Sequence, residues 1–257
     1  MEKVKIKIIQ YGMLAQQIDY KKIINHKSSI FEVISYDYHP NMPDCDNGVD
    51  YICYPDKQWE RLMPKSNHKV DLVFGITDFA LDDNFYSRRL KNGRVIFSFR
   101  NIREYLNVAN IPLENMLIKQ LYEYCIYLFK QKYSQTAPMY HNETRCCLYD
   151  KNGAIDDIAL SCSTLQLCDE CKDKLRSWGF NKKEIKALVK ELKKVKKPSF
   201  YIILDWIKRH PIIAILLSFV FSVISELVSS GIIYIWPKYI WPMVKTMVKS
   251  VFLYFFS

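Results

Sequence analysis

Glycine is scarce in this chain, with 7 in 257 residues, and no glycine-rich loop is present. A loop that cradles phosphates needs closely spaced glycines, because only they let the backbone approach the phosphate groups. The sequence therefore gives no indication of nucleotide binding. The N-terminus has no apolar run behind its first charges, and such a run is the mark of a signal peptide. No secretory leader is predicted.

Excess positive charge is absent from the first two thirds of the chain, although the formal net charge is +10. Residues 1–171 carry 21 Lys and Arg against 22 Asp and Glu, residues 172–209 carry 13 against 4, and residues 210–257 carry 3 against 1. A nucleic-acid-binding domain would carry its basic residues on its own surface. Their concentration in one connecting segment predicts a basic belt beside a membrane, and no nucleic acid partner.

Cysteine, by contrast, is present in quantity. Five of the eight cysteines lie between residues 146 and 171, and the last two form Cys168-x-x-Cys171. A C-x-x-C turn supplies two of the four ligands of a tetrahedral zinc site. The other two are expected to be Cys147 and one of Cys146, Cys162 or His141. The alternative is a set of unrelated buried thiols. Disulfides are not favoured, because nothing in the sequence indicates secretion.

Apolar residues in the first 180 positions follow the pattern of an α/β domain. Strands are predicted at residues 4–8, 31–38 and 70–74. Helices are predicted at residues 13–25, 102–106, 113–133 and 172–197. Glu114 and Glu123 are expected at surface or capping positions of the third helix. Asp78, Asp82 and Asp83 are interpreted as turn and capping carboxylates in preference to a cation site.

The cysteine spacing resembles the end of the archaemetzincin signature, a metzincin protease pattern of the form HExxHxxGxxHCx4CM followed by CxxC. The matching positions are His141 on the third histidine, Cys147 on the cysteine six residues later, and Cys168 and Cys171 on the closing pair. Asn142 stands where the first cysteine would be, so Cys146 or Cys162 is a candidate replacement for that ligand. The resemblance implies a mixed sheet with helices, an edge strand at residues 94–99, and a structural zinc separate from the catalytic one.

When this alignment of the cysteine motif is extended towards the N-terminus, the chain lacks the residues of the family's catalytic motif. The HExxH motif would fall on residues 131–135, which read Gln-Lys-Tyr-Ser-Gln, and Pro138 replaces the glycine. A metzincin needs two histidines at i and i+4, a glutamate base and a third histidine, and this chain keeps only His141. No catalytic residue is predicted, so we expect a protease scaffold without protease activity. A working metalloprotease with unusual ligands is the less favoured alternative.

A long apolar segment begins at Pro211. It runs for 26 residues with one charge, Glu226, and a helix of this length crosses a bilayer core of roughly 30 Å. Basic residues predicted to lie at the membrane surface precede it: Lys193, Lys194, Lys196, Lys197, Lys208 and Arg209. The positive-inside rule then places the N-terminal domain in the cytoplasm, at the cell inner membrane. The cytosol keeps thiols reduced, which favours zinc over disulfides.

Two features predict more than an anchor. A lone carboxylate within a span normally faces a partner helix or water, so Glu226 indicates a homo-oligomer or an ion conduit, unless a tilted helix brings it near the interface. Lys245 and Lys249 lie on one stripe of an otherwise apolar stretch, residues 240–257. This stretch is predicted to form an amphipathic second helix, either in the interface or as a second span that lines water.

The predicted fold class is α/β: a metzincin-like mixed sheet with helices and a zinc knuckle, plus C-terminal transmembrane helical segments. Residues 1–180 would form a degenerate archaemetzincin-like cytoplasmic domain, residues 181–210 a basic juxtamembrane helical linker, and residues 211–257 the transmembrane region, with one span and an amphipathic second helix. The expected cofactor is one structural zinc. The expected partners are the lipid bilayer, further copies of the chain, and a protein or peptide of unknown identity.

This layout predicts a membrane effector, in which a soluble sensor domain controls a membrane-disrupting or pore-forming tail. By analogy, such a layout would suit bacterial or antiviral defence. The second interpretation is a membrane-tethered binding or scaffold module whose tail is only an anchor. Glu226→Leu separates the two interpretations, because it would inactivate a conduit and leave an anchor unharmed.

Overall fold

The computed structural model describes residues 2–46, 53–130, 139–235, 241–242 and 245. The chain divides into two compact units, Met1–Pro198 and Ser199–Ser257. The first is an α/β unit and the second is helical in its described part. The predicted end of the domain was residue 180, whereas residues 181–198 belong to the first unit. The reason is burial, since the helix α7 (Lys182–Leu192) contributes three side chains to the main core: Ile185, Leu188 and Leu192.

A five-stranded mixed sheet with the order β2-β1-β4-β7-β6 forms the centre of the first unit. Its strands are β1 (Val4–Tyr11), β2 (Phe31–His39), β4 (Leu72–Thr77), β6 (Ser87–Leu90) and β7 (Arg94–Ser98). The pairs β1–β2, β1–β4 and β4–β7 are parallel, and β6–β7 is antiparallel. A second sheet consists of β3 (Cys53–Tyr54) and β5 (Ala80–Leu81). The four strands predicted from the sequence are confirmed.

The predicted edge position of β7 is wrong, because β6 occupies that edge. The turn between the two strands contains Asn92 and Gly93, both with positive φ, at 58° and 63°. Two consecutive residues with positive φ form the two-residue turn whose twist matches that of the flanking strands in a hairpin. Asparagine followed by glycine is the preferred sequence for this turn. The hairpin returns the chain antiparallel to β6 and leaves β7 inside the sheet.

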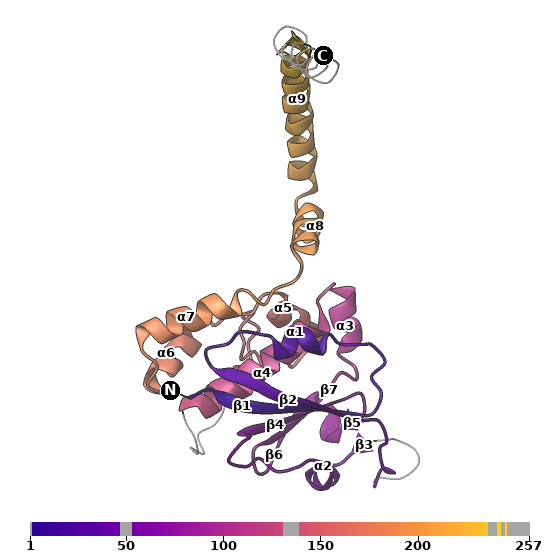
Figure 1. The fold of residues 1–257 in the computed structure, drawn as a ribbon, viewed down its shortest axis with the longest axis vertical. Helices are drawn as coiled ribbons and strands as arrows, with labels where there is room; N and C mark the ends of the chain where they lie inside the picture. The colour runs from indigo at the N-terminus through magenta and orange to yellow at the C-terminus, as the bar shows by residue number, and fades with distance from the viewer. Residues whose placement is uncertain (1, 47–52, 131–138, 236–240, 243–244, 246–257) are drawn as a thin grey trace, which may run out of the picture. The chain divides into compact units, whose positions relative to one another are not determined.

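The sheet buries both of its faces. In β1, Ile6 and Ile8 belong to the main core, whereas Ile9 and Tyr11 belong to a smaller one. This is the two-residue alternation of a strand. The helix α4 (Leu113–Lys130) lies on one side of the sheet and α2 (Asp56–Leu62) on the other (Figure 1). The remaining elements of the first unit are α1 (Tyr20–Ile24), the short turn η1 (Asp82–Asn84), α3 (Arg103–Val108), η2 (Ile155–Asp157), α5 (Ile158–Ser163) and α6 (Asp169–Ser177).

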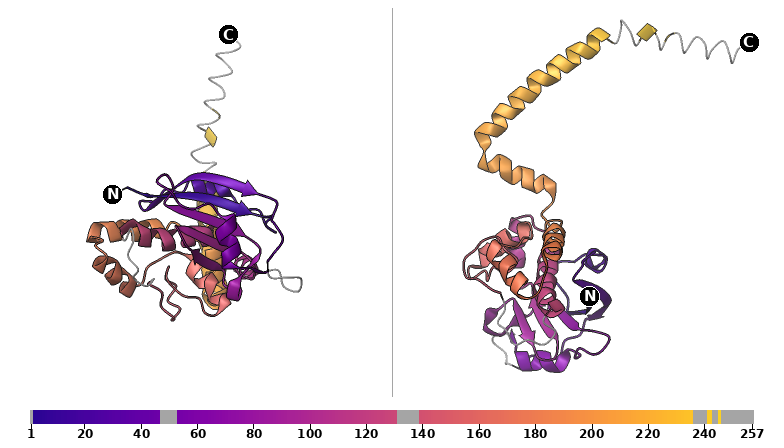
Figure 2. Two further views of the ribbon diagram at one scale, coloured as in Figure 1. Left: turned by 90° about the horizontal axis from the view of Figure 1, so that it is seen from below. Right: turned by 90° about the vertical axis from the view of Figure 1, so that its left-hand side faces the viewer.

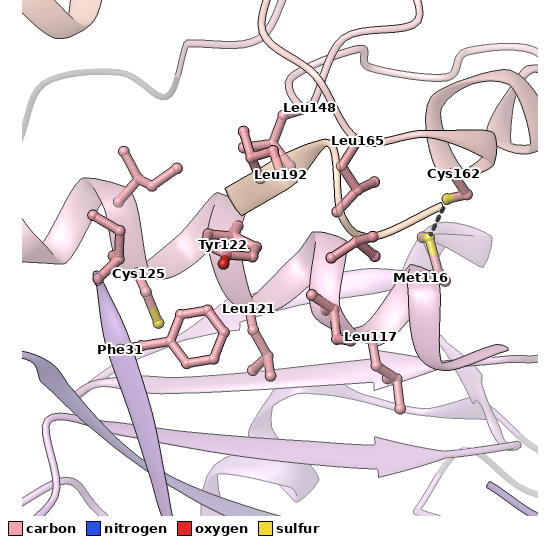
Figure 3. Close-up of a cluster of buried hydrophobic side chains, with 14 of the residues drawn as sticks. Phe31, Met116, Leu117, Leu121, Tyr122, Cys125, Leu148, Cys162, Leu165 and Leu192 are labelled. Carbon is pink, nitrogen blue, oxygen red and sulfur yellow. Dashed lines mark hydrogen bonds between the residues drawn. The ribbon is translucent and has the colours of Figure 1, made fainter. Parts of the chain in front are cut away.

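The helix α4 supplies much of the main core. Its residues Leu117, Leu121, Tyr122 and Cys125 are at most 1% exposed, and the last three lie beside Phe31 of β2 (Figure 3). The predicted core face of this helix is therefore confirmed. The predicted surface position of Glu123 is wrong: it is 5% exposed, and its carboxylate lies 3.2 Å from the Lys119 ammonium.

Two predicted helices are shorter than expected. The first was expected over residues 13–25 and is reduced to α1. A tertiary acceptor takes a backbone donor that a longer helix would need, because Asp19 N–H donates to the Glu114 carboxylate and not to the Ala15 carbonyl. The helix expected over residues 172–197 is divided into α6 and α7. Gly179 has φ +86° between them, and α7 begins with a capping box of Asn181 and Glu184.

The second unit contains α8 (Ser199–Arg209) and α9 (Pro211–Ile235). Figure 2 shows them as separate helices that meet at a bend, where Pro211 lacks the N–H that a continuous helix would need. Of the helices in the described residues, α9 is the one long and apolar enough to cross a membrane, with a mean hydropathy of 2.4 over residues 211–230. The second helix predicted over residues 240–257, with Lys249, lies mostly outside the described residues.

Candidate metal centre

Four side chains from three segments converge beside the main core: His141, Cys147, Cys168 and Cys171. His141 lies in an isolated bridge with Asp150, and Cys147 lies in the loop between these two residues. Cys168 is the N-cap of α6, and Cys171 lies in its first turn. The C-x-x-C pair therefore sits at the N-terminal end of a helix.

The distances in this cluster fit a tetrahedral zinc ion. Bonds of about 2.3 Å to sulfur and 2.0–2.1 Å to nitrogen place two sulfurs about 3.8 Å apart, and a sulfur and a nitrogen about 3.6 Å apart. The Cys147 and Cys171 sulfurs are 3.7 Å apart, and the Cys168 sulfur is 3.6 Å from His141 Nε2. All four ligand atoms lie within 4.8 Å of one another. A disulfide would bring the sulfurs to about 2.0 Å, and all eight cysteines are free.

The groups around the cluster hold its ligands in position. His141 Nδ1 is 2.9 Å from the Glu143 carbonyl oxygen and 3.3 Å from Asp150 Oδ1, which leaves Nε2 to face the sulfurs. The other carboxylate oxygen of Asp150 accepts the N–H groups of Arg145 and Cys147, at 3.1 and 2.8 Å. Asp150 thus fixes the cysteine loop and the histidine together. Asp150 was not among the predicted site residues. The sequence signal that could have identified it is a carboxylate three residues after the ligand Cys147, placed to close a turn.

The environment of Cys147 favours its thiolate. A hydrogen bond from Cys171 lowers the pKa of Cys147, and backbone N–H groups of Tyr149 and Cys168 act in the same direction against the effect of burial. A metal requires the deprotonated thiol, so this loop presents a ligand in the form that zinc binds. Three cysteines and one histidine fill the four positions of zinc and leave none for water, which is the composition of a structural site.

The other two candidate ligands lie outside the cluster. Cys146 is half-buried and has φ 56°, so it forms the turn that presents Cys147. Cys162 is fully buried on α5, with its sulfur 3.3 Å from Met116 Sδ in the main core (Figure 3). His141 is therefore the fourth member of the group. The resemblance had matched His141 to the third histidine of a catalytic zinc site, whereas here it completes the cysteine set.

The segment that would hold a protease motif lies outside the described residues, which stop at Lys130 and resume at Met139. Beside that gap, the structure contains a pocket of about 220 Å³ between α4 and the strands β6 and β7. Its lining includes five aromatic side chains: Tyr124, Tyr127, Tyr140, Tyr149 and Trp178. Arg89 of β6 lies at this pocket, with its guanidinium 5.0 Å from the centre of the Tyr127 ring.

The residues predicted to meet a membrane fall into two groups. Lys193, Lys194 and Lys196 on the first unit are exposed, as are the following residues of the second: Lys208, Arg209, Glu226 and Lys245. The surface position predicted for Lys197 is wrong. Its side chain is 4% exposed, because its backbone N–H donates to the Ser163 carbonyl at 2.7 Å and holds the segment against α5.

No protein-family model and no curated protein matches the chain. Among solved structures, that of archaemetzincin from Methanopyrus kandleri is similar, with 13% sequence identity and a TM-score of 0.43. The match covers 68% of this chain and 95% of the archaemetzincin chain. A match with this identity and TM-score supports no conclusion about activity. The assignment of the metal centre therefore depends on the geometry of its four side chains alone.

Proposed function

We propose that this protein is a zinc-stabilised membrane effector without protease activity, in which the first unit binds a partner and the tail permeabilises a membrane. The observation that carries the proposal is α9, a helix of 25 residues whose large apolar side chains are exposed from Ile212 to Val228. A surface of this kind is stable in hydrocarbon and costly in water. Inner-membrane location, with the first unit in the cytoplasm, follows from the basic residues before the span.

The position of Glu226 favours an assembly over a simple anchor. It lies 15 residues after Pro211, about 22 Å along the helix, and so within a hydrocarbon core of roughly 30 Å. Ser222 and Ser229, at i−4 and i+3, share its face. A carboxylate in lipid requires hydrogen-bonding partners or water. Further copies of α9 supply both, because packed helices can place their polar faces around a shared centre.

The aromatic pocket of the first unit supports the binding role. No carboxylate in the described part of the chain forms an ion pair with Arg89, which leaves this guanidinium for an acidic group. The neighbouring carboxylate of Glu123 is already engaged by Lys119 and Gln120. The pocket therefore suits a protein or peptide that offers an apolar side chain next to a carboxylate.

The effector proposal is tested by measuring membrane potential in bacteria that express the full chain, with residues 1–198 and Glu226→Leu as comparisons. We expect depolarisation by the full chain and none by residues 1–198. Glu226→Leu should lose most of the effect, whereas the matched variant Glu226→Gln keeps a hydrogen-bonding group and should retain more of it. Purified full chain in dye-loaded vesicles at rising protein density repeats the test without a cellular trigger. Membrane-located protein that releases no dye at any density would contradict the proposal.

The second candidate function is a membrane-tethered binding module, which the aromatic pocket with Arg89 favours. Under this alternative, Glu226→Leu leaves function unchanged and Arg89→Glu abolishes partner capture. Arg89→Gln is the matched control for lost charge without reversal. The absence of protease activity is tested separately, with a fluorogenic peptide library and added zinc. Cleavage that is lost in His141→Ala but survives Cys168→Ser would overturn that part of the proposal.

A further inference from the structure

The helix α8 has two chemically distinct faces. Phe200, Ile203, Leu204 and Ile207 recur at the i, i+3, i+4, i+7 spacing of one helical face. Ile202 and Trp206 extend this apolar face on one side. Three polar or charged residues at i, i+4, i+7 occupy the remaining side of the helix: Tyr201, Asp205 and Lys208. No residue of this helix is buried, and Phe200, Ile203 and Trp206 are 69%, 58% and 41% exposed. Its apolar face therefore lacks a partner of matching chemistry in the described chain.

The position of α8 in the chain limits what can cover that face. The helix ends at Arg209, and only His210 separates it from Pro211, where α9 begins. Two residues span at most about 7 Å. When α9 enters a bilayer, the end of α8 must lie in the headgroup region, and the bend at Pro211 frees α8 from the direction of the span. The bilayer surface around the entry point of α9 therefore lies within reach of α8.

The charges and aromatic residues of α8 match that surface. Lys208 and Arg209 are exposed at the end nearest the span, where cations are attracted by anionic headgroups. Trp206 lies at the border of the apolar face, and tryptophan favours the boundary between headgroups and acyl chains. A helix with these properties lies in the plane of the interface with its apolar side in the acyl region.

We propose that α8 is an in-plane membrane-binding helix that lies on the leaflet where α9 enters and recognises anionic lipid headgroups. Phe200, Ile203 and Ile207 insert among the acyl chains, while Asp205 and Lys208 face water and the headgroups. This inference rests on the membrane anchoring proposed above for α9. It adds a second contact with the bilayer, which fixes the depth at which the span begins.

Hydrogen exchange of the full chain in vesicles tests the proposal, because mass spectrometry reports residues 199–209 and 211–230 separately. In vesicles of phosphatidylcholine with phosphatidylglycerol, we expect amides of residues 199–209 to exchange at least about tenfold more slowly than in Ile203→Asp. Tyr201→Asp is the matched control, since it adds the same charge to the same helix on the polar face. It should retain the slow exchange. Vesicles of phosphatidylcholine alone should give weaker protection.

The possible outcomes separate α8 from the anchor. Fast exchange at residues 199–209 together with protection at residues 211–230 overturns the α8 proposal and leaves the anchor standing. Fast exchange in both segments removes the anchor, and the α8 proposal with it. Equal protection in the wild type and Ile203→Asp assigns the slow exchange to contacts other than the acyl chains and overturns the proposal. Equal protection with and without phosphatidylglycerol overturns the assignment of anionic headgroups.

Discussion

At the scale of single residues, the cysteines differ in the environment of their sulfur atoms. Burial among apolar side chains raises the pKa of Cys162 to about 11 and also raises that of Cys125. Hydrogen bonds from Cys171 and from backbone N–H groups have the opposite effect and lower the pKa of Cys147. Thiols of the first kind pack as small apolar groups, whereas a thiolate of the second kind is ready to bind a metal.

The ligand set predicts which cysteine substitutions remove the metal. Cys147→Ser should lose the zinc and at least about 3 kcal/mol of stability, which corresponds to roughly 10 °C in Tm for a domain of this size. Cys146→Ser is the matched control, because its sulfur lies one residue away and outside the cluster. Elemental analysis of zinc per chain and thermal unfolding give both readouts. One zinc per chain in Cys147→Ser, or its loss in Cys146→Ser, would contradict the assigned set.

His26 should make the stability of the first unit depend on pH. Its ring stacks on Phe31, and its Nε2 is 2.9 Å from the Tyr122 hydroxyl. Burial lowers the pKa of His26, with Glu191 opposing the shift and Lys194 and Lys22 adding to it. The native state therefore binds fewer protons than the unfolded state below about pH 6.5. The stabilisation is complete above that pH and is lost as the pH falls towards the lower native pKa.

We accordingly expect the free energy of unfolding to decrease between about pH 7.5 and pH 5.5 by more in the wild type than in His26→Gln. Glutamine keeps a polar group near Tyr122 and does not titrate. Other acid-sensitive groups, including the zinc ligands, are shared by both proteins and cancel in the comparison. Urea unfolding at the two pH values measures the difference. Parallel pH dependence in the two proteins would show that His26 does not titrate on unfolding.

At the scale of elements, α4 carries a buried ion pair between Lys119 and Glu123, one turn apart. Burial would lower the pKa of Lys119, but the adjacent Glu123 carboxylate outweighs this effect and raises it, so the ammonium stays charged. Lys119→Met should cost roughly 3–5 kcal/mol, because it leaves a carboxylate buried without its counter-charge. Lys119→Met with Glu123→Gln removes both charges and should recover most of the loss. A double variant as unstable as the single one would show that the pair is not coupled.

At the scale of the whole molecule, the boundary between the two units determines which fragment folds. Residues 1–198 keep α7, whose Leu188 and Leu192 are fully buried and whose Glu191 accepts the Ser29 N–H at 2.9 Å and the Tyr122 hydroxyl at 3.1 Å. Residues 1–180 would expose the core under α7. We expect the longer fragment to be a soluble monomer with cooperative unfolding and the shorter one to aggregate. Size-exclusion chromatography and circular dichroism distinguish them. Equal behaviour of the two fragments would place the domain end at residue 180.

The sequence by itself determined the elements whose signal is local. Alternation of apolar residues located β1, the apolar run from Pro211 located α9, and Cys168-x-x-Cys171 marked half of the metal site. These signals are local because strand period, helix period and ligand spacing depend on neighbours a few residues apart.

Only the tertiary structure decided which distant segments meet. His141, and neither Cys146 nor Cys162, became the fourth ligand, because the loop closed by Asp150 brings its imidazole to α6 while α5 turns Cys162 towards Met116. Packing of α7 on α4 likewise moved the end of the domain from residue 180 to Pro198. Convergence and burial depend on the packing of segments far apart in the chain, and short-range periodicity does not contain that information.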